Sequence, residues 1–190
     1  MKLQTFLYGL ILWLPLFLVA CGEDDLKNAN AVSSKKVTFT RDRTLGVEII
    51  YSDSARVKAK GKAPIMDKVT PSSGTGYEEM IKGVNIDFFN PNGTISGNLV
   101  CDYAIRKEEI KQTIFRKNVV VKNDKGDTFS SEELIWDEAK KIFYSTQRVF
   151  VKGVDGSIGD GINFKAPQDF STYEMETGSG QLNMQEGIAP

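Results

Sequence analysis

Residues 117–164 decide the fold, and they read KNVVVKNDKGDTFSSEELIWDEAKKIFYSTQRVFVKGVDGSIGDGINF. Short apolar runs in this stretch alternate with polar clusters, such as Asn123-Asp124-Lys125-Gly126 and Asp155-Gly156. Apolar runs of about four to eight residues, bounded by Asn, Asp and Gly, are typical of half-buried strands joined by tight turns. The sequence therefore predicts an all-β chain of antiparallel strands.

The same stretch contains an internal repeat. Two valines, a lysine and a turn glycine occur twice at one spacing, first as Val119, Val121, Lys122 and Gly126 and again as Val149, Val151, Lys152 and Gly156. An apolar residue with an aspartate three positions later occurs at Ile50, Leu99 and Leu134. Because self-similarity at a fixed period marks a stacked architecture, we predict about four units of roughly 30 to 35 residues. An all-β chain without a repeat would also show alternation and glycine turns, but the recurring aspartate favours the repeat.

Local signals set the expected boundaries. We expect the strands to begin at Thr44, with residues 46–53 and 55–59 as the first pair. The prolines and glycines of residues 61–76 predict a loop or an edge crossing. Residues 106–111 and 131–134 contain good helix formers, but each falls at a turn position of the repeat, so we expect a hairpin connection and a turn.

The composition excludes several classes of function. With 24 basic and 25 acidic residues, the chain lacks the basic surface that nucleic acids require. It contains no histidine, which removes the commonest general base and the commonest transition-metal ligand. We therefore expect a protein that is not an enzyme, with no catalytic residue, no metal and no cofactor. Asp102 and Asp137 are the remaining candidates for a carboxylate pair, and turn capping explains them better.

Residues 1–20 have the pattern of a signal peptide. Lys2 precedes an apolar run from Phe6 to Val19, which is short for a membrane span. The sequence Leu18-Val19-Ala20-Cys21-Gly22 resembles the lipobox of bacterial lipoproteins, in which cleavage precedes a cysteine that carries diacylglycerol. We expect lipidation at Cys21 and anchoring through its acyl chains. An uncleaved signal anchor with an incidental cysteine is the alternative.

The rest of the chain divides into a tether, a folded body and a tail. Residues 21–40, which begin with Cys21, are mostly polar and predict a flexible tether, although the acidic triplet 23–25 is alternatively a sorting signal. Residues 41–177 should form the folded domain, and residues 178–190 a flexible C-terminal tail. Cys101 has no histidine to activate it, so we expect a buried packing residue and not a nucleophile.

Alternate residues of a strand lie on one face, so the spacing also predicts which side chains point inward. The predicted inward residues are Val84, Ile86, Leu99, Cys101, Val119, Val121, Leu134, Trp136, Ile142, Val149, Val151, Ile162 and Phe164. In a rolled sheet this face lines an apolar groove, whereas in a filled sandwich the same residues form a core.

The repeat resembles the OstA-type repeat of periplasmic lipopolysaccharide-transport proteins. The resemblance is carried by Val119-x-Val121, Gly126, Ser131-Glu132-Glu133-Leu134-Ile135-Trp136-Asp137, Val149-x-Val151 and Gly159-x-Gly161, and it covers about Ile49 to Tyr173. With an N-terminal anchor and a body of this size, the chain is most similar to the LptC family, the membrane-anchored subunits of the lipopolysaccharide export bridge. The lipobox is a departure, since members of this family are often held by a transmembrane helix. The chain therefore resembles a lipoprotein-anchored variant.

The resemblance implies an open β-jelly roll with an apolar groove inside. In the family, this groove accepts lipopolysaccharide from an ABC transporter and passes it to the next jelly roll. Strand-edge pairing joins the roll to the periplasmic jelly-roll domains of the transporter's membrane subunits and to a soluble bridge protein of the LptA type. We expect a periplasmic protein that is lipid-anchored to the inner membrane, or alternatively to the outer membrane. The alternative function is a structural or sorting outer-membrane lipoprotein with a filled β-core and no lipid ligand.

Overall fold

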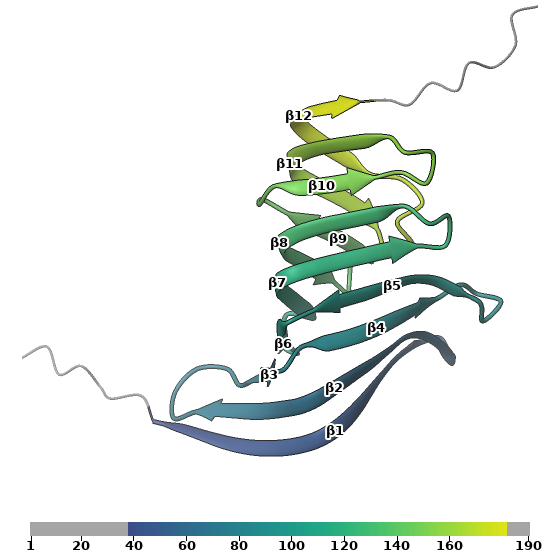
Figure 1. Ribbon diagram of the computed structural model, residues 1–190. Helices are drawn as coiled ribbons and strands as arrows, with labels where there is room; N and C mark the ends of the chain where they lie inside the picture. The colour runs from purple at the N-terminus through teal and green to yellow at the C-terminus, as the bar shows by residue number, and fades with distance from the viewer. Residues whose placement is uncertain (1–37, 182–190) are drawn as a thin grey trace, which may run out of the picture. The chain divides into compact units, whose positions relative to one another are not determined.

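The computed structural model describes residues 38–181. This part of the chain contains no helix, and its twelve strands form one antiparallel sheet (Figure 1). The prediction of an all-β, jelly-roll-like fold is confirmed. The predicted signal peptide, the lipidation site Cys21 and nearly all of the predicted tether lie outside the described residues.

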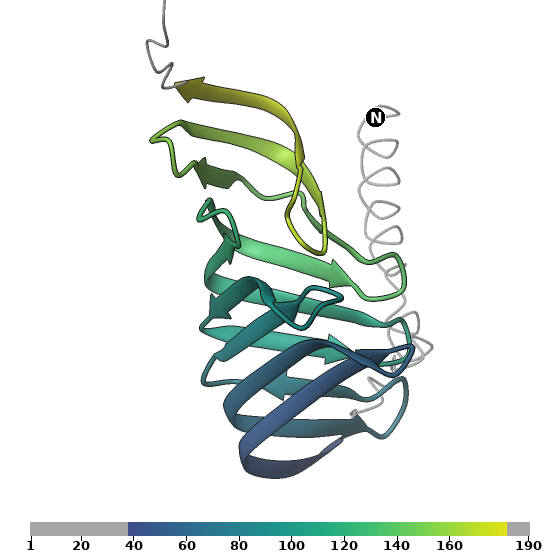
Figure 2. The ribbon, with the colours of Figure 1, turned by 90° about the vertical axis from the view of Figure 1, so that its right-hand side faces the viewer.

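The strands vary in length, and the first two are the longest. In chain order they are β1 (Phe39–Asp53), β2 (Arg56–Pro71), β3 (Tyr77–Met80), β4 (Val84–Phe89), β5 (Ile95–Cys101), β6 (Tyr103–Lys107), β7 (Gln112–Asn123), β8 (Thr128–Asp137), β9 (Ile142–Ser145), β10 (Val149–Lys152), β11 (Ile158–Pro167) and β12 (Glu174–Gln181). The long pair β1 and β2 forms one end of the sheet, and β12 forms the other (Figures 1 and 2).

The sheet folds over, so its strands form two layers. In β7, residues 112–116 pair with β6 while residues 120–123 pair with β5. In the same way, β8 pairs with β9 through residues 135–137 and with β10 through residues 128–131. We call the layer with β4, β5 and β10 the first layer, and the layer with β3, β6 and β9 the second layer. The strands β2, β7, β8 and β11 run through both.

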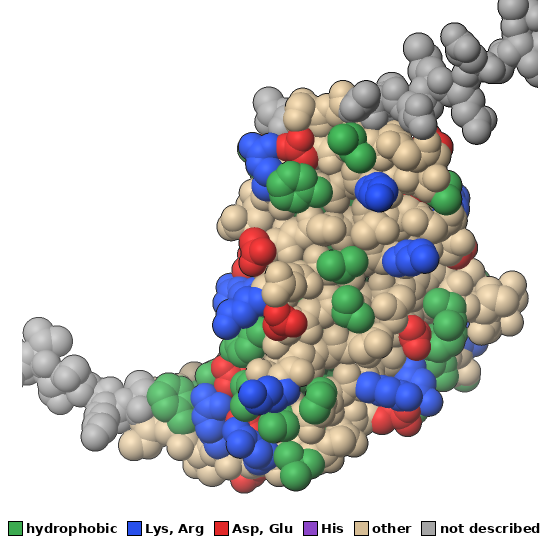
Figure 3. Space-filling model, in the orientation of Figure 1, with side chains coloured by type: hydrophobic (Ala, Val, Ile, Leu, Met, Phe, Trp, Pro, Cys, Tyr) green, Lys and Arg blue, Asp and Glu red, His purple; other side chains and the backbone are tan. Residues whose placement is uncertain are grey.

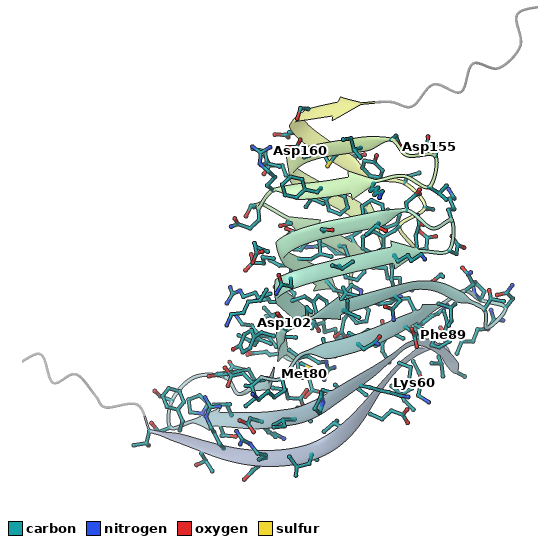
Figure 4. All side chains as sticks on the ribbon, viewed as in Figure 1. Lys60, Met80, Phe89, Asp102, Asp155 and Asp160 are labelled. Atoms are coloured by element: carbon teal, nitrogen blue, oxygen red, sulfur yellow. The ribbon has the colours of Figure 1, made fainter. Side chains whose placement is uncertain are left out.

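The strands bend where they pass from one layer to the other, along what we call the corner side. The bend in β7 contains Lys117 and Asn118, whose φ angles are 63° and 51°, and the bend in β11 contains Asn163, with a φ of 52°. Left-handed backbone is uncommon for residues with a side chain, so these residues mark a sharp change of strand direction. Asp102 and Asp160 lie toward this side in Figure 4.

The opposite side, which we call the open side, is formed by turns. The first-layer turns 90–94, 124–127 and 153–157 and the second-layer turns 108–111 and 138–141 all lie there. Phe89 and Asp155 mark the first-layer part of this side in Figure 4.

The two copies of the sequence repeat occupy equivalent places on either side of β8. Val119 of β7 and Val149 of β10 both pair with Ser131. The turns that follow contain Gly126 and Gly156, whose φ angles are 95° and 86°. Glycine adopts this conformation without a steric penalty, which explains why it recurs at both turns.

The expected loop or edge crossing over residues 61–76 is wrong for residues 61–71, which belong to β2, whereas residues 72–76 do form the connection to β3. The strand β1 begins at Phe39 instead of Thr44. Of the two prolines in this segment, Pro71 ends β2, and Pro64 lies opposite Gly46 at the bend of the β1–β2 pair, where neither Pro64 nor Gly46 is part of the ladder. A proline at such a bend removes no ladder hydrogen bond. The long hairpin therefore tolerates it.

Other boundaries also differ from those expected. Residues 131–134 belong to β8 and not to a turn, because β9 and β10 pair with β8 on both sides of this segment. The strand β12 extends to Gln181, into the residues expected as the tail, because it pairs with β11. The hairpin connection expected over residues 106–111 is confirmed as the turn 108–111 between β6 and β7.

Candidate functional site

The space between the two layers is the candidate site. Most of the predicted inward residues are buried there, namely Val84, Ile86, Leu99, Cys101, Val119, Val121, Leu134, Trp136, Val149, Val151 and Phe164. They form one apolar cluster that reaches from β4 to β11.

The prediction that Ile142 and Ile162 point inward is wrong. Ile142 is half-buried, while its neighbour Phe143 is fully buried and pairs with the inward Trp136. Because side chains alternate, Ile142 lies on the outer face. Ile162 is 36% exposed and precedes Asn163, which bends β11 at the corner side.

Sequence reasoning missed the aromatic residues that fill much of the interior. The fully or nearly fully buried rings are Phe88, Phe115, Phe129, Phe143 and Phe170. Phe143 is central, because its ring centroid lies 4.7 Å from that of Phe170, 5.4 Å from that of Phe88 and 6.0 Å from that of Trp136. Large aromatic side chains dominate the energetics of such cores. The part of the interior between β8, β9 and β11 is therefore packed.

The interior is less completely filled toward β1 and β2. A hollow of about 120 Å³ lies between the layers and is lined by apolar residues such as Ile49 and Met80 and by the polar Thr113 and Glu138. Trp136 also lines it. Among the residues that the structure describes, the Trp136 indole nitrogen is the one buried side-chain nitrogen or oxygen without a hydrogen-bond partner. Buried polar groups are normally satisfied, so this unpartnered donor is an exception within the core.

A charged group borders this hollow. Arg106 of β6 lies 3.3 Å from Glu78 and 3.3 Å from Glu138, and Thr113 donates a hydrogen bond of 3.4 Å to Glu138. Because Arg106 has two carboxylate partners, its charge is balanced where it borders the apolar interior.

A larger hollow of about 660 Å³ opens at the corner side, where β2 leaves β4. Its lining includes the buried side chains of Ala63, Val84 and Cys101 and the charged side chains of Lys62, Lys82 and Glu48. The Glu48 carboxylate lies 2.8 Å from the Lys60 ammonium, which balances its charge. Hollows of about 300 to 1,000 Å³ are the usual size of small-molecule sites. Apolar groups beside two lysines suit an amphipathic anion.

Cys101 is buried, as expected. Its Sγ donates a hydrogen bond of 3.2 Å to the carbonyl oxygen of Tyr103. Burial raises the pKa of the thiol to about 11. A thiol that stays protonated is a poor nucleophile, so this position suits packing.

The outer face of the first layer is a weaker candidate. Its exposed hydrophobic side chains include Val100, Phe150 and Ile158, and Figure 3 shows such residues as separate small patches between polar atoms. An open hollow of about 530 Å³ lies beside Phe150, Ile158 and Ser179. Scattered exposed apolar residues are normal on protein surfaces.

An ionic cluster fastens β1 to β2 and β3. Arg43 donates hydrogen bonds of 2.7 and 2.8 Å to the buried carboxylate of Asp67, and Arg41 lies 3.2 Å from the same group. Arg41 also lies 2.8 Å from Glu79 of β3. The hydrogen bonds from Arg43 are the main cause of the lowered pKa of Asp67.

This cluster predicts a pH-dependent stability. A carboxyl whose pKa is lower in the folded than in the unfolded chain stabilises the fold above its unfolded pKa, and this contribution is lost as the pH falls through the folded pKa. We expect Asp67→Asn to lower the urea midpoint at pH 7, and the difference from wild type to shrink below about pH 4. Circular dichroism at several pH values measures both midpoints. Asp124→Asn is the control, because Asp124 is exposed. A difference in urea midpoint between wild type and Asp67→Asn that is the same at pH 2 as at pH 7 contradicts the role given to the Asp67 carboxylate.

Within residues 38–181, no helix is long and apolar enough to cross a membrane. No group of three or more His, Cys, Asp and Glu side chains in this range could hold a metal ion. The fold defines an all-β domain whose single sheet encloses an apolar interior. No family model and no curated protein matches the chain.

Proposed function

We propose that the protein is a non-enzymatic, membrane-anchored component of a lipopolysaccharide export bridge. Its interior would accept the acyl chains of lipopolysaccharide from an ABC transporter, while the sugars and phosphates stay in water. The apolar cluster between the two layers, which reaches from β4 to β11, is the observation that carries this proposal. The OstA-type repeat and the lipobox at Cys21 support it, and they favour a periplasmic protein held at the inner membrane.

The two hollows near β1 and β2 support entry at that end. The 660 Å³ hollow combines apolar residues with Lys62 and Lys82, and its one acidic residue, Glu48, is paired with Lys60. This lining suits the junction between acyl chains and phosphorylated sugars. The smaller hollow is lined mostly by apolar residues, including Ile49, Met80 and Trp136, which suits an acyl chain. Residues of β1 and β2 line both hollows.

The ends of the sheet suit the proposed partners. Within residues 38–181, the strands β1 and β12 each pair with one neighbour, so each has one edge that no described strand occupies. Free edges form hydrogen bonds with a strand of another chain. The β1 edge would meet the transporter's periplasmic domain, and the β12 edge would meet the soluble bridge protein.

One observation favours a second function. The rings of Phe115, Phe143 and Phe164 are at most 1% exposed, as expected for a filled core. A structural or sorting lipoprotein with no lipid ligand would need nothing more than such a core. The two functions differ in whether lipopolysaccharide reaches the interior.

Photo-cross-linking separates these functions. Tyr51 lines the smaller hollow, and its ring lies 5.2 Å from that of Trp136. A photoreactive phenylalanine at position 51 preserves the aromatic shape. We expect it to form an adduct with lipopolysaccharide in intact cells, detected as a mobility shift that reacts with antibody to the glycolipid.

Tyr144 is the matched control, because it is a tyrosine on the outer face, adjacent to the buried Phe143. The same photoreactive residue at position 144 should give no adduct. If position 51 gives no more adduct than position 144, the lipid-carrier proposal fails and the filled-core function is favoured.

A further inference from the structure

The connection between β11 and β12 crosses the open side between the two layers. We call residues 168–173 the strap. At one end, the backbone N–H of Gln168 donates a 3.0 Å hydrogen bond to the carbonyl oxygen of Lys141, in a second-layer turn. Further along, Lys125 of a first-layer turn donates a 3.3 Å hydrogen bond to the carbonyl oxygen of Ser171. The strap therefore connects the two layers on the open side, where none of the described strands does so.

The strap inserts one aromatic side chain into the interior. Phe170 is 2% exposed, and Asn123 of the first layer donates a 3.3 Å hydrogen bond to its carbonyl oxygen. Its ring centroid lies 4.7 Å from that of Phe143 and 5.1 Å from that of Phe129. Phe170 completes the packed part of the core.

Phe170 differs from its neighbours in how the chain holds it. Phe129, Phe143 and Phe164 lie on paired strands, whereas the strap belongs to no ladder. Phe170 also has a φ of 52°, which is unfavourable for a bulky residue. An outward movement of the strap would break the hydrogen bonds from Asn123 and Lys125 but no ladder hydrogen bond.

The space that Phe170 fills has the chemistry of an alkyl-chain site. The rings that surround it offer only apolar surface, and Phe143 also contacts Trp136, which borders the smaller hollow. Filling this space with an acyl chain in place of the ring would keep the rings of Phe129 and Phe143 out of water. The row of rings thus continues the apolar path from the hollow toward β11.

We propose that the position of the Phe170 ring is an acyl-chain subsite that the strap closes in the free protein. This inference rests on the proposed function, and it adds a gate: an entering chain displaces Phe170, and the strap closes again when the chain leaves. The strap thereby shields the interior from water between occupants.

Fluorescence quenching tests the gate. Trp13 lies in the predicted signal peptide, and Trp13→Phe leaves Trp136 as the only tryptophan whether or not that segment is cleaved. A fatty acid brominated at mid-chain should quench Trp136 when it lies beside Phe143. We expect Phe170→Ala to bind this probe at least about tenfold more tightly than the parent, because no ring must be expelled. Circular dichroism shows whether the variant is folded.

Phe164→Ala is the matched control, because it removes an equally buried ring from β11 and leaves the strap in place. Its affinity should stay within about threefold of the parent, since Phe170 still closes the subsite. An equal gain in probe affinity in Phe170→Ala and Phe164→Ala overturns the gate, because any void in the core would then be enough to tighten binding. An unchanged affinity in Phe170→Ala, with quenching in the parent, also overturns the gate and leaves the lipid-carrier function standing.

A second variant avoids the core. Lys125 is exposed, and Lys125→Ala removes only its hydrogen bond to the strap. We expect tighter probe binding by about two- to fivefold, in keeping with the loss of one modest hydrogen bond. If neither Lys125→Ala nor Phe170→Ala binds the probe more tightly than the parent, the gate is overturned. If neither the brominated fatty acid nor lipopolysaccharide binds any variant, both the gate and the proposed lipid-carrier function fail.

Discussion

Phe143→Ala should lower the free energy of unfolding by about 3–5 kcal/mol, the usual cost of removing a buried phenylalanine ring. Phe143 is fully buried and contacts Phe88, Trp136 and Phe170. These residues come from the first layer, the second layer and the strap, so the structure cannot close around the void by moving one element. Native domains are stable by about 5–15 kcal/mol, so this loss removes a large share of the total.

Urea unfolding followed by circular dichroism measures this loss. Phe150→Ala is the control, because Phe150 is 54% exposed on the outer face and its replacement should change stability by less than about 0.5 kcal/mol. A loss below about 1 kcal/mol for Phe143→Ala would mean that the interior adapts to a missing ring. That result would contradict a tightly packed core in the free protein.

The packing of Phe143 bears directly on the proposed transport. A groove that is empty in the free protein would expose apolar surface to water, which is unfavourable. Here the rings close the interior between β8 and β11, and one of them, Phe170, is on a segment outside the sheet. A filled interior and a lipid carrier are compatible if a displaceable side chain occupies the lipid's place.

The sequence predicted the sheet well because its signals are local. Alternation identifies the inward valines of β7 and β10, and the recurring glycines identify their turns. The same alternation would have identified Phe88, which continues the spacing of Val84 and Ile86, as an inward residue. Phe88 lies outside the two Val-x-Val copies, on which the repeat prediction rests.

Other features depend on distant parts of the chain. The burial of Phe170 could not be predicted, because it lies outside any alternating run and is placed by turns that are distant in sequence. The path of β2 was misjudged because Pro64 predicts a break, and only pairing with β1 shows that the bend accommodates it. The inward prediction for Ile142 failed by one residue, and such a slip reverses every side chain of a strand.

Cys101 should react with a thiol reagent far more slowly in the native protein than in the unfolded chain. Burial raises its pKa from 9.0 to about 11, so at pH 8 the reactive thiolate is about a hundredfold scarcer, before steric protection is counted. In a chain with Cys21→Ser, Cys101 is the only cysteine. Labelling at pH 8, with and without urea, measures the ratio directly.

The same thiol lines the 660 Å³ hollow at the corner side, so its protection depends on what fills that hollow. A cysteine at the 74% exposed position Val154, in a chain without Cys21 and Cys101, is the control and should react at an ordinary rate. If native Cys101 reacts as fast as this control, its packing role is wrong. Because bound lipid would cover Val84 and Ala63 beside the thiol, lipopolysaccharide should slow the labelling further, whereas a protein without a lipid ligand would show no change.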